Sequence, residues 1–142
     1  MADRKNTIQH AAIPYRMTES GPQVLLVTSR ETRRWIIPKG WAKKALDPQD
    51  MAALEAYEEA GVRGKVKKKP LGEYQYGKRM DDGSLVTCDV TVFALEVTTE
   101  LTEWPEHTQR ERRWLSVPDA VALISEPGLV PVLQRLGAKW AP

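Results

Sequence analysis

The chain has 142 residues and a formal net charge of +2, with 42% hydrophobic and 28% charged residues. This length and composition are typical of one globular domain with a real apolar core. The charge is too small to indicate a nucleic-acid partner, and neither an apolar run of roughly 18 residues nor a hydrophobic leader is visible. Cys88 is the one cysteine, which fits a reducing compartment. We therefore expect a cytoplasmic protein without membrane contact.

Runs of apolar residues predict three strands in the first third of the chain. These strands are expected at residues 8–15, 23–29 and 35–37. The middle one, QVLLVTS, is apolar at most positions, which is typical of a central strand buried on both faces. Pro38 stops the third strand, and a loop is predicted after it.

A capped helix is predicted between Asp47 and Gly61. Asp47 is a good N-cap, Pro48 suits the first helical position, and Gly61 tolerates the left-handed conformation that ends a helix. The side chains expected to pack on a sheet are small or apolar: Ala53, Ala56, Tyr57 and Ala60.

The same helix carries three glutamates on its other face. Glu55, Glu58 and Glu59 lie at spacings i, i+3 and i+4, so their carboxylates are neighbours and repel one another. A hard divalent cation would turn this repulsion into oxygen coordination. The alternative is a solvated acidic face without a ligand.

The second half of the chain predicts more strands and two short helices. Strands are expected at residues 71–76, 85–97 and 110–117, a hairpin turn at 80–84, a loop at 98–109, and helices at 118–124 and 129–136. The segment RGKVKKK, residues 63–69, indicates an edge strand protected by lysines, a positive rim that attracts a polyanion, or both. Cys88 is expected to be packed in a strand. The order of elements predicts a mixed sheet with helices on both faces.

Seven residues between Gly40 and Val62 follow a fixed spacing. They are Gly40, Glu55, Ala56, Glu58, Glu59, Gly61 and Val62. This spacing resembles the Nudix box, which reads G, five residues, E, seven residues, then R-E-U-x-E-E-x-G-U with U aliphatic. Leu46 and Leu54 stand where that family has Glu and Arg. We interpret the two changes as one ion pair exchanged for an apolar contact, a swap that can be neutral or stabilising.

Three longer segments are similar to the diphosphoinositol polyphosphate phosphohydrolases, one branch of the Nudix hydrolases. These segments are residues 23–40, 55–64 and 101–124, and the likeness extends over most of residues 8–136. The resemblance implies a single α/β domain over residues 1–142. Its expected architecture is the Nudix α/β/α sandwich, with a mixed β-sheet and a catalytic loop-helix-loop.

The resemblance also implies a hydrolase that cleaves phosphoanhydride bonds with Mg²⁺, or with Mn²⁺ in its place. The implied metal ligands are Glu55, Glu58, Glu59 and the backbone carbonyl at Gly40. The general base would be either Glu58 or Glu55, which spacing alone does not separate. Glu106 and Glu111 are candidates for a further acidic residue from a late loop.

Substrate contacts are expected to be cationic, because a pyrophosphate is heavily anionic. The candidates flank the predicted catalytic loop or lie in a late basic cluster: Arg33, Arg34, Lys39, Lys43, Arg110 and Arg112. Arg34, directly before Trp35, best matches the phosphate-binding position of the branch. The number of cations favours a small substrate with many phosphates, a diphosphoinositol polyphosphate or a dinucleoside polyphosphate.

Two alternatives stay open from the sequence. One is a nucleotide or nucleotide-sugar pyrophosphatase of another Nudix branch, for which an aromatic pair stacking on a base would be diagnostic. The other is a catalytically silent Nudix fold that binds a ligand. The changes at Leu46 and Leu54 support the silent fold, and retention of all three helix glutamates argues against it.

Overall fold

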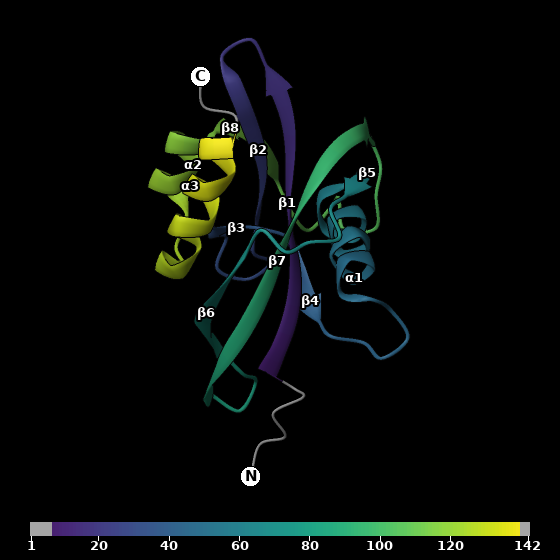
Figure 1. Ribbon diagram of the computed structural model, residues 1–142. Coiled ribbons are helices and arrows are strands. Elements are labelled where there is room, and N and C mark those ends of the chain that lie inside the picture. Colours follow the sequence, from purple (N-terminus) through teal and green to yellow (C-terminus); the bar gives the residue numbers. More distant parts are fainter. Residues whose placement is uncertain (1–6, 140–142) are drawn as a thin grey trace.

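The structure is a computed structural model and describes residues 7–139. These residues form one sheet of eight strands with helices on both faces (Figure 1). The strands are β1 Ile8–Thr18, β2 Gly21–Thr28, β3 Trp35–Ile36, β4 Lys39–Trp41, β5 Val62–Val66, β6 Gly72–Arg79, β7 Leu85–Glu100 and β8 Arg112–Ser116. The helical elements are α1 Pro48–Glu55, the π-helical turn η2 Ala56–Ala60, α2 Val117–Leu123, the 3-10 turn η3 Pro127–Leu129 and α3 Val130–Lys139.

The centre of the sheet is a parallel pair of long strands, β1 and β7. They are in register from Ile8 opposite Asp89 to Tyr15 opposite Glu96. β7 is long enough to take two antiparallel partners along its other edge, β6 on its first half and β5 on its second. The mixed sheet predicted from the sequence is therefore present.

β1 also divides its other edge between two strands. Its last residues pair with the start of β2, and residues Gln9–Ala11 pair with β4. β2 pairs with β1 only as far as Val24 and pairs with β3 at Val27 and Thr28, whereas β8 pairs with β2 from Gln23 to Val27. The box glycine, Gly40, thus lies in a strand beside β1, at the place where β2 leaves it.

The two faces of the sheet are covered by different helices (Figure 1). α1 and η2 cover one face, where Ala52, Ala56 and Ala60 are fully buried against a cluster that includes Phe93. Such small side chains let a helix approach the sheet closely. α2 and α3 cover the other face and pack on the larger cluster, which includes Leu133. This arrangement confirms the predicted α/β/α sandwich.

Several local predictions are confirmed. Gly61 ends the helix with φ 67°. Gly83, with φ 87°, lies in the turn that joins β6 to β7. β5 pairs only with β7 among the described strands, so residues 62–66 form an edge strand. Cys88 is buried in β7.

Two local predictions are wrong. The loop predicted after Pro38 begins with a strand, because Lys39–Trp41 finds hydrogen-bonding partners in β1. The loop predicted at residues 98–109 begins three residues later, because β7 continues to Glu100 opposite Val62. Asp47 is the N-cap of α1, as predicted, although its side chain makes no capping hydrogen bond.

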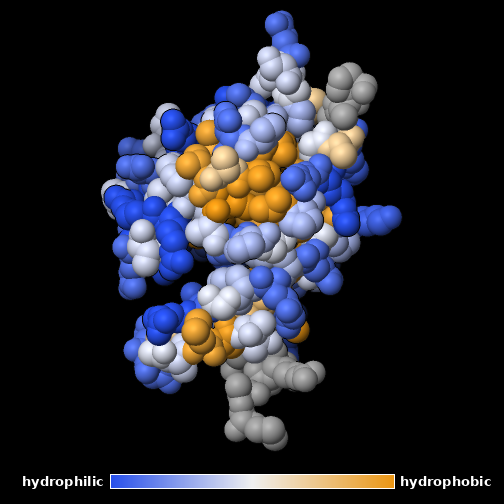
Figure 2. All heavy atoms as spheres, turned by 90° about the vertical axis from the view of Figure 1, so that its left-hand side faces the viewer, coloured by the Kyte–Doolittle hydropathy of each residue, from blue (hydrophilic) through white to orange (hydrophobic). Residues whose placement is uncertain are grey.

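The outer surface of the layer formed by α2 and α3 is partly apolar. Figure 2 shows a group of hydrophobic side chains on this face, surrounded by hydrophilic ones. Leu123 of α2 is 39% exposed. In the part of the chain that the structure describes, no helix is both long and apolar enough to cross a membrane.

Candidate active site

The three box glutamates lie where the regular helix changes into a π-helical turn. α1 ends at Glu55, and η2 follows over five residues before Gly61. π-helical turns are rare and often lie at functional sites. Positions i and i+4 of a helix lie on the same face. Glu55 and Glu59 are accordingly buried together, 8% and 5% exposed, whereas Glu58 is half-buried.

Glu55 fills the space that a side chain at position 40 would need. A Cβ added to Gly40 would overlap the Oε1, Cδ and Cγ atoms of Glu55. Because β4 is held in register with β1, its backbone cannot retreat from this contact without losing sheet hydrogen bonds. The box glycine is therefore required by the close approach of β4 to the carboxylate.

Glu55 and Glu59 form a hydrogen-bonded carboxyl pair. Burial raises the pKa of Glu55, and it raises the pKa of Glu59 well above its usual range. The hydrogen bond between them raises the pKa of Glu59 further and lowers that of Glu55. The two buried carboxylates also repel each other, and the guanidinium of Arg110 opposes this effect at Glu59. A divalent cation bound to both carboxylates would favour their ionised forms.

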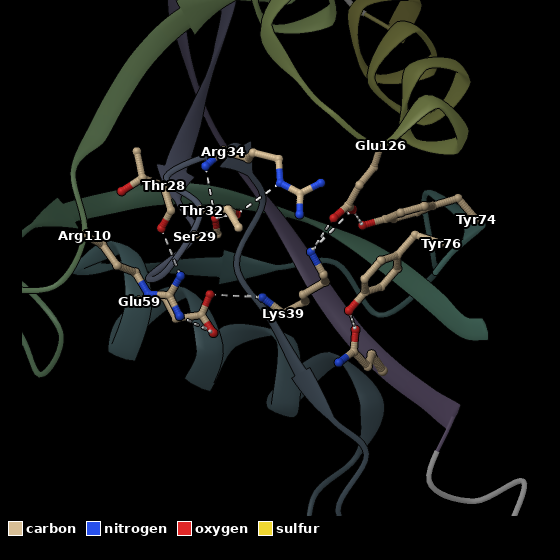
Figure 3. Close-up of polar contacts among 11 residues, drawn as sticks. Thr28, Ser29, Thr32, Arg34, Lys39, Glu59, Tyr74, Tyr76, Arg110 and Glu126 are labelled. Atoms are coloured by element: carbon tan, nitrogen blue, oxygen red, sulfur yellow. Dashed lines mark hydrogen bonds and ion pairs between the residues drawn. The ribbon is translucent and has the colours of Figure 1, made fainter. Parts of the chain in front are cut away.

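Glu59 is fixed by groups from two other elements (Figure 3). The backbone N–H of Lys39 donates to its Oε1 at 3.3 Å, and Arg110 Nη2 lies 3.7 Å from its Oε2. Arg110 itself is 8% exposed and also donates to the Thr28 carbonyl at 3.0 Å and to Glu106 Oε1 at 2.9 Å. Arg110 therefore holds Glu59 against β2 and the 101–111 loop.

The two late acidic candidates differ in position. Glu106 shares Arg110 with Glu59, and its negative charge raises the pKa of both Glu55 and Glu59. Glu111 is exposed, and its contact with Thr28 is made by its backbone N–H. Of the two, Glu106 is the one that the fold brings to the carboxyl pair.

The donor set fits a hard divalent cation. Glu55 and Glu59 offer carboxylate oxygens, and Glu58 has no side-chain hydrogen bond or ion pair within residues 7–139. Mg²⁺ needs only one or two protein carboxylates, with water and substrate phosphate completing its shell. No three Asp, Glu, His or Cys side chains of the described residues already surround one metal position. Further ligands would therefore be water, backbone or phosphate oxygens.

Two of the predicted cations, Lys43 and Arg34, differ in what they act on. The positive charge of Lys43 partly opposes the effect of burial on the pKa of Glu55, so Lys43 acts electrostatically on this carboxylate. Arg34 is exposed and donates its Nε to Thr32 Oγ1 at 3.0 Å. Its guanidinium points toward Lys39 and Glu126 in Figure 3. Its two terminal nitrogens have no hydrogen-bond partner within the described residues.

Lys39 contributes to the site with its backbone and directs its side chain elsewhere. Its Nζ lies 3.1 Å from Glu126 Oε2 and 4.6 Å from the centre of the Tyr76 ring. Tyr74 donates to Glu126 Oε1 at 2.7 Å, and Tyr76 donates to Gln9 Oε1 at 2.7 Å. This second network lies on the side of the sheet that α2 and α3 cover (Figure 3).

The remaining predicted substrate arginines have partners within the chain. Arg33, with φ 54°, donates to the Gln109 carbonyl at 3.3 Å. Arg112 donates to the carbonyls of Ala60 and Gly61, at 2.9 and 3.2 Å, and so binds the end of η2. With Arg110, these side chains hold the scaffold together.

Sequence reasoning missed the second network and the aromatic support of η2. Glu126 and Lys39 are 87 positions apart, and no motif joins them. Trp104 donates its Nε1 to the Glu59 carbonyl at 3.0 Å, and its ring lies under Arg112 at 4.0 Å. The alternation of Tyr74 and Tyr76 indicated that both side chains lie on one face of a strand. It did not indicate that they would contact Glu126 and Gln9.

Comparisons with known proteins identify the family. The NUDIX domain matches residues 8–136. Nudix hydrolase 16, mitochondrial, of Arabidopsis thaliana is 34% identical over 87% of this chain and 71% of its own length. Diphosphoinositol polyphosphate phosphohydrolase 2 of Rattus norvegicus is 32% identical over 99% of this chain and 76% of its own length. Nudix hydrolase 12, mitochondrial, of Arabidopsis thaliana is 39% identical, but the chain spans about half, 51%, of its length.

Solved structures show the same fold at low sequence identity. An Ap4A hydrolase of C. elegans superposes with a TM-score of 0.68 at 15% identity, over 94% of this chain and 97% of that one. The NUDIX domain of Shewanella oneidensis NrtR, solved with ADP ribose, gives a TM-score of 0.69 at 12% identity over 94% and 88%.

The chain belongs to the Nudix hydrolase family. This result confirms the predicted family, the fold and the enzyme class, a Nudix-type hydrolase. Members of this family in general depend on a divalent metal. The identity of the metal and of the substrate is a separate question.

Proposed function

We propose that this protein is a Mg²⁺-dependent phosphohydrolase that cleaves phosphoanhydride bonds in small polyphosphorylated molecules, with Mn²⁺ able to replace Mg²⁺. The observation that carries the proposal is the buried Glu55–Glu59 carboxyl pair, pressed against the β4 backbone at Gly40. A like-charge pair held in this way costs stability unless a cation balances it. Arg110 lies beside Glu59, and a divalent cation shared by both carboxylates would balance the pair as a whole, which supports metal binding.

Glu55, Glu58 and Glu59 would hold the metal together with the backbone at Gly40. When bound, the metal would neutralise phosphate charge and lower the pKa of coordinated water. Arg110 keeps Glu59 in place, and the Lys39 backbone N–H restrains its Oε1. Glu58 or Glu55 would accept the proton of the attacking water. Glu58 suits that role because its carboxylate has no side-chain partner in the described chain.

The substrate class we propose is a diphosphoinositol polyphosphate or a dinucleoside polyphosphate. Arg34 supports it, because its exposed guanidinium keeps both terminal nitrogens available for phosphate oxygens. Lys43 adds a positive charge on the side of Glu55. The name of the rat relative, a diphosphoinositol polyphosphate phosphohydrolase, agrees with this class.

The test is phosphate release with Mg²⁺ from a substrate panel. The panel contains inositol pyrophosphates, dinucleoside tetra- to hexaphosphates, nucleotide sugars and nucleoside triphosphates. We expect turnover of the first two groups. Glu58→Gln and Glu59→Gln should lower kcat by about 10² to 10⁴, the usual contribution of a base or charge stabiliser. Glu19→Gln, in the exposed β1–β2 turn, is the matched control and should have no effect.

The alternatives give different results in the same assay. Turnover restricted to nucleotide sugars would indicate the other Nudix branch. Binding of a panel member without turnover would indicate a ligand-binding module. Full activity in both glutamine variants would refute the proposed site.

A further inference from the structure

A hollow on the surface between β5, β6 and α3 is lined by cationic side chains. Its volume is about 470 Å³, within the range of small-molecule sites. The cations of this hollow are Lys67, Lys68, Lys69, Arg135 and Lys139, and no acidic side chain lines it. The floor is apolar and consists of Pro70, Leu71 and Ala94.

The segment that carries the three lysines is fixed at both ends. The Lys67 N–H donates to the Ala94 carbonyl at 2.9 Å, and the Leu71 N–H donates to the Val92 carbonyl at 2.7 Å. Both acceptors belong to β7, at the place where its partner changes from β5 to β6. Residues 68–70 therefore arch over the edge of β7 between two anchors, and their backbone is ordered before any ligand binds.

The opposite wall is fixed by close packing of α3. Arg135 donates its Nη1 to the Leu71 carbonyl at 2.9 Å. A Cβ added to Gly72 would come within 3.2 Å of Val132, which shows how tightly β6 and α3 approach. Arg135 therefore faces the lysine arch from a rigid position, and its other guanidinium nitrogens have no hydrogen-bond partner within residues 7–139.

The three lysines at residues 67–69 are not neutralised by their neighbours. Lys67, Lys68 and Lys69 take part in no ion pair with a described residue. The chain holds 21 basic and 19 acidic residues, so that 16 basic and 19 acidic residues remain outside the hollow. The small net charge of the protein thus conceals a positive site on a molecule that is otherwise slightly acidic. Lysines protecting an edge strand would not need an arginine from a separate helix to face them.

We propose that this hollow binds a small anion with several phosphate groups, at a site separate from the catalytic carboxylates. No residue that lines it belongs to the candidate active site. Arginine grips phosphate through its planar fork, and lysines add point charges that suit a dense anion. The volume of about 470 Å³ favours a small molecule over a peptide or a nucleic acid, which would need an extended groove. The site goes beyond the proposed hydrolysis and does not depend on it.

The test measures binding of inorganic tripolyphosphate to the full chain in the presence of a metal chelator. Under these conditions turnover is absent, so the result is independent of the catalytic proposal. We expect saturable changes in the backbone amide resonances of residues 67–71 and 135–139. We also expect an affinity that falls as salt is added, because the cations are exposed.

The matched variants carry the same change in net charge at different places. Lys67→Gln, Lys68→Gln and Lys69→Gln combined should weaken binding at this site about tenfold, the sum expected for three exposed charge contacts. Lys65→Gln, Lys78→Gln and Arg79→Gln combined lie outside the hollow and should change the affinity less than about twofold. Thermal unfolding of both triple variants checks that they are folded.

Three results would overturn the proposal. The first is an absence of resonance changes at residues 67–71 in the parent protein. The second is equal weakening by the two triple variants, which would reveal a general charge effect. The third is equal or tighter binding of citrate or of a short RNA at the same residues, which would assign the hollow to carboxylates or nucleic acid.

Discussion

At the scale of single residues, Lys39 joins the two polar networks around the site. Its backbone N–H donates to Glu59, and its side chain, 8% exposed, pairs through Nζ with Glu126 at 3.1 Å. Tyr74 donates to the same Glu126 carboxylate. A buried pair adds little over an apolar contact, but removal of one partner leaves the other charge unpaired in a poorly solvated place. The stability of the pair should therefore depend strongly on both members.

We expect Glu126→Ala to lower the free energy of unfolding by about 3 kcal/mol, because Lys39 is left buried without its partner. Glu126→Gln should cost less, since its amide oxygen still accepts from Lys39 and Tyr74. A Lys39→Met, Glu126→Leu double variant should recover most of the loss. Urea unfolding at pH 7 measures all three. A loss below about 0.5 kcal/mol in Glu126→Ala, as expected of ordinary surface changes, would contradict the coupling.

His10 makes stability depend on pH through its burial. It is 8% exposed, its Nδ1 has no partner among residues 7–139, and burial lowers its pKa. A lowered pKa means that the unfolded chain takes up a proton at a pH where the folded chain does not. The free energy of unfolding contributed by His10 is thus full above its ordinary pKa of about 6.5 and falls as the pH drops below it.

The measurement compares the parent with His10→Gln in urea unfolding between pH 5 and pH 8. We expect the parent to lose stability relative to the variant as the pH falls through about 6.5. The difference between the two curves removes the contribution of all other titrating groups. A constant difference over this pH range would show that His10 does not titrate differently in the folded state.

At the scale of elements, the change from α1 to η2 organises the site. The π-helical turn buries Glu55 and Glu59 together, and Arg112 and Trp104 hold the carbonyls at its end. The loop before α1 has less support. Leu46 and Leu54, which replace the charged pair of the box, are both half-buried and belong to neither core cluster. Their apolar contact stays a prediction.

We expect Leu46→Glu to lower the free energy of unfolding by about 1 kcal/mol, because it sets a charge beside an apolar Leu54. The double variant Leu46→Glu, Leu54→Arg should recover the loss by restoring an ion pair. Thermal and urea unfolding of the parent, the single variant and the double variant measure these differences in the free energy of unfolding. A Leu46→Glu protein more stable than the parent would show that the two leucines do not support each other.

At the scale of the whole molecule, the sheet brings distant segments to one place. β1 pairs with β2 over its last residues and with β4 over Gln9–Ala11, and this division inserts Gly40 beside Glu55. The 101–111 loop supplies Arg110 and Glu106 from the far end of the chain. Metal binding at this junction should therefore stabilise the entire fold.

We expect Mg²⁺ to raise the free energy of unfolding of the parent, by about 2.7 kcal/mol at a concentration one hundred times its dissociation constant. The gain should vanish in Glu55→Gln, Glu59→Gln because the folded state then loses its preferential affinity for the metal. Scanning calorimetry with and without Mg²⁺ measures the effect. Equal stabilisation of the parent and the double variant would place the metal elsewhere.

Local signals in the sequence were enough to predict several elements and two of the site carboxylates. Gly61 ended the helix, apolar runs marked the central strands, and the box spacing selected Glu55 and Glu59, because backbone conformation and periodicity are properties of neighbouring residues. The sequence did not reveal β4, since three residues form a strand only when a partner edge is available.

Which charged side chains pair with one another depends on the folded arrangement of the chain. From the sequence, Lys39, Arg110 and Arg112 were equivalent candidates for phosphate. In the fold Lys39 pairs with Glu126, and Arg110 and Arg112 bind Glu59 and the backbone of η2. The physical reason is that an ion pair or hydrogen bond between residues far apart in the chain depends on strand register and packing. Neither is encoded in the spacing of one segment.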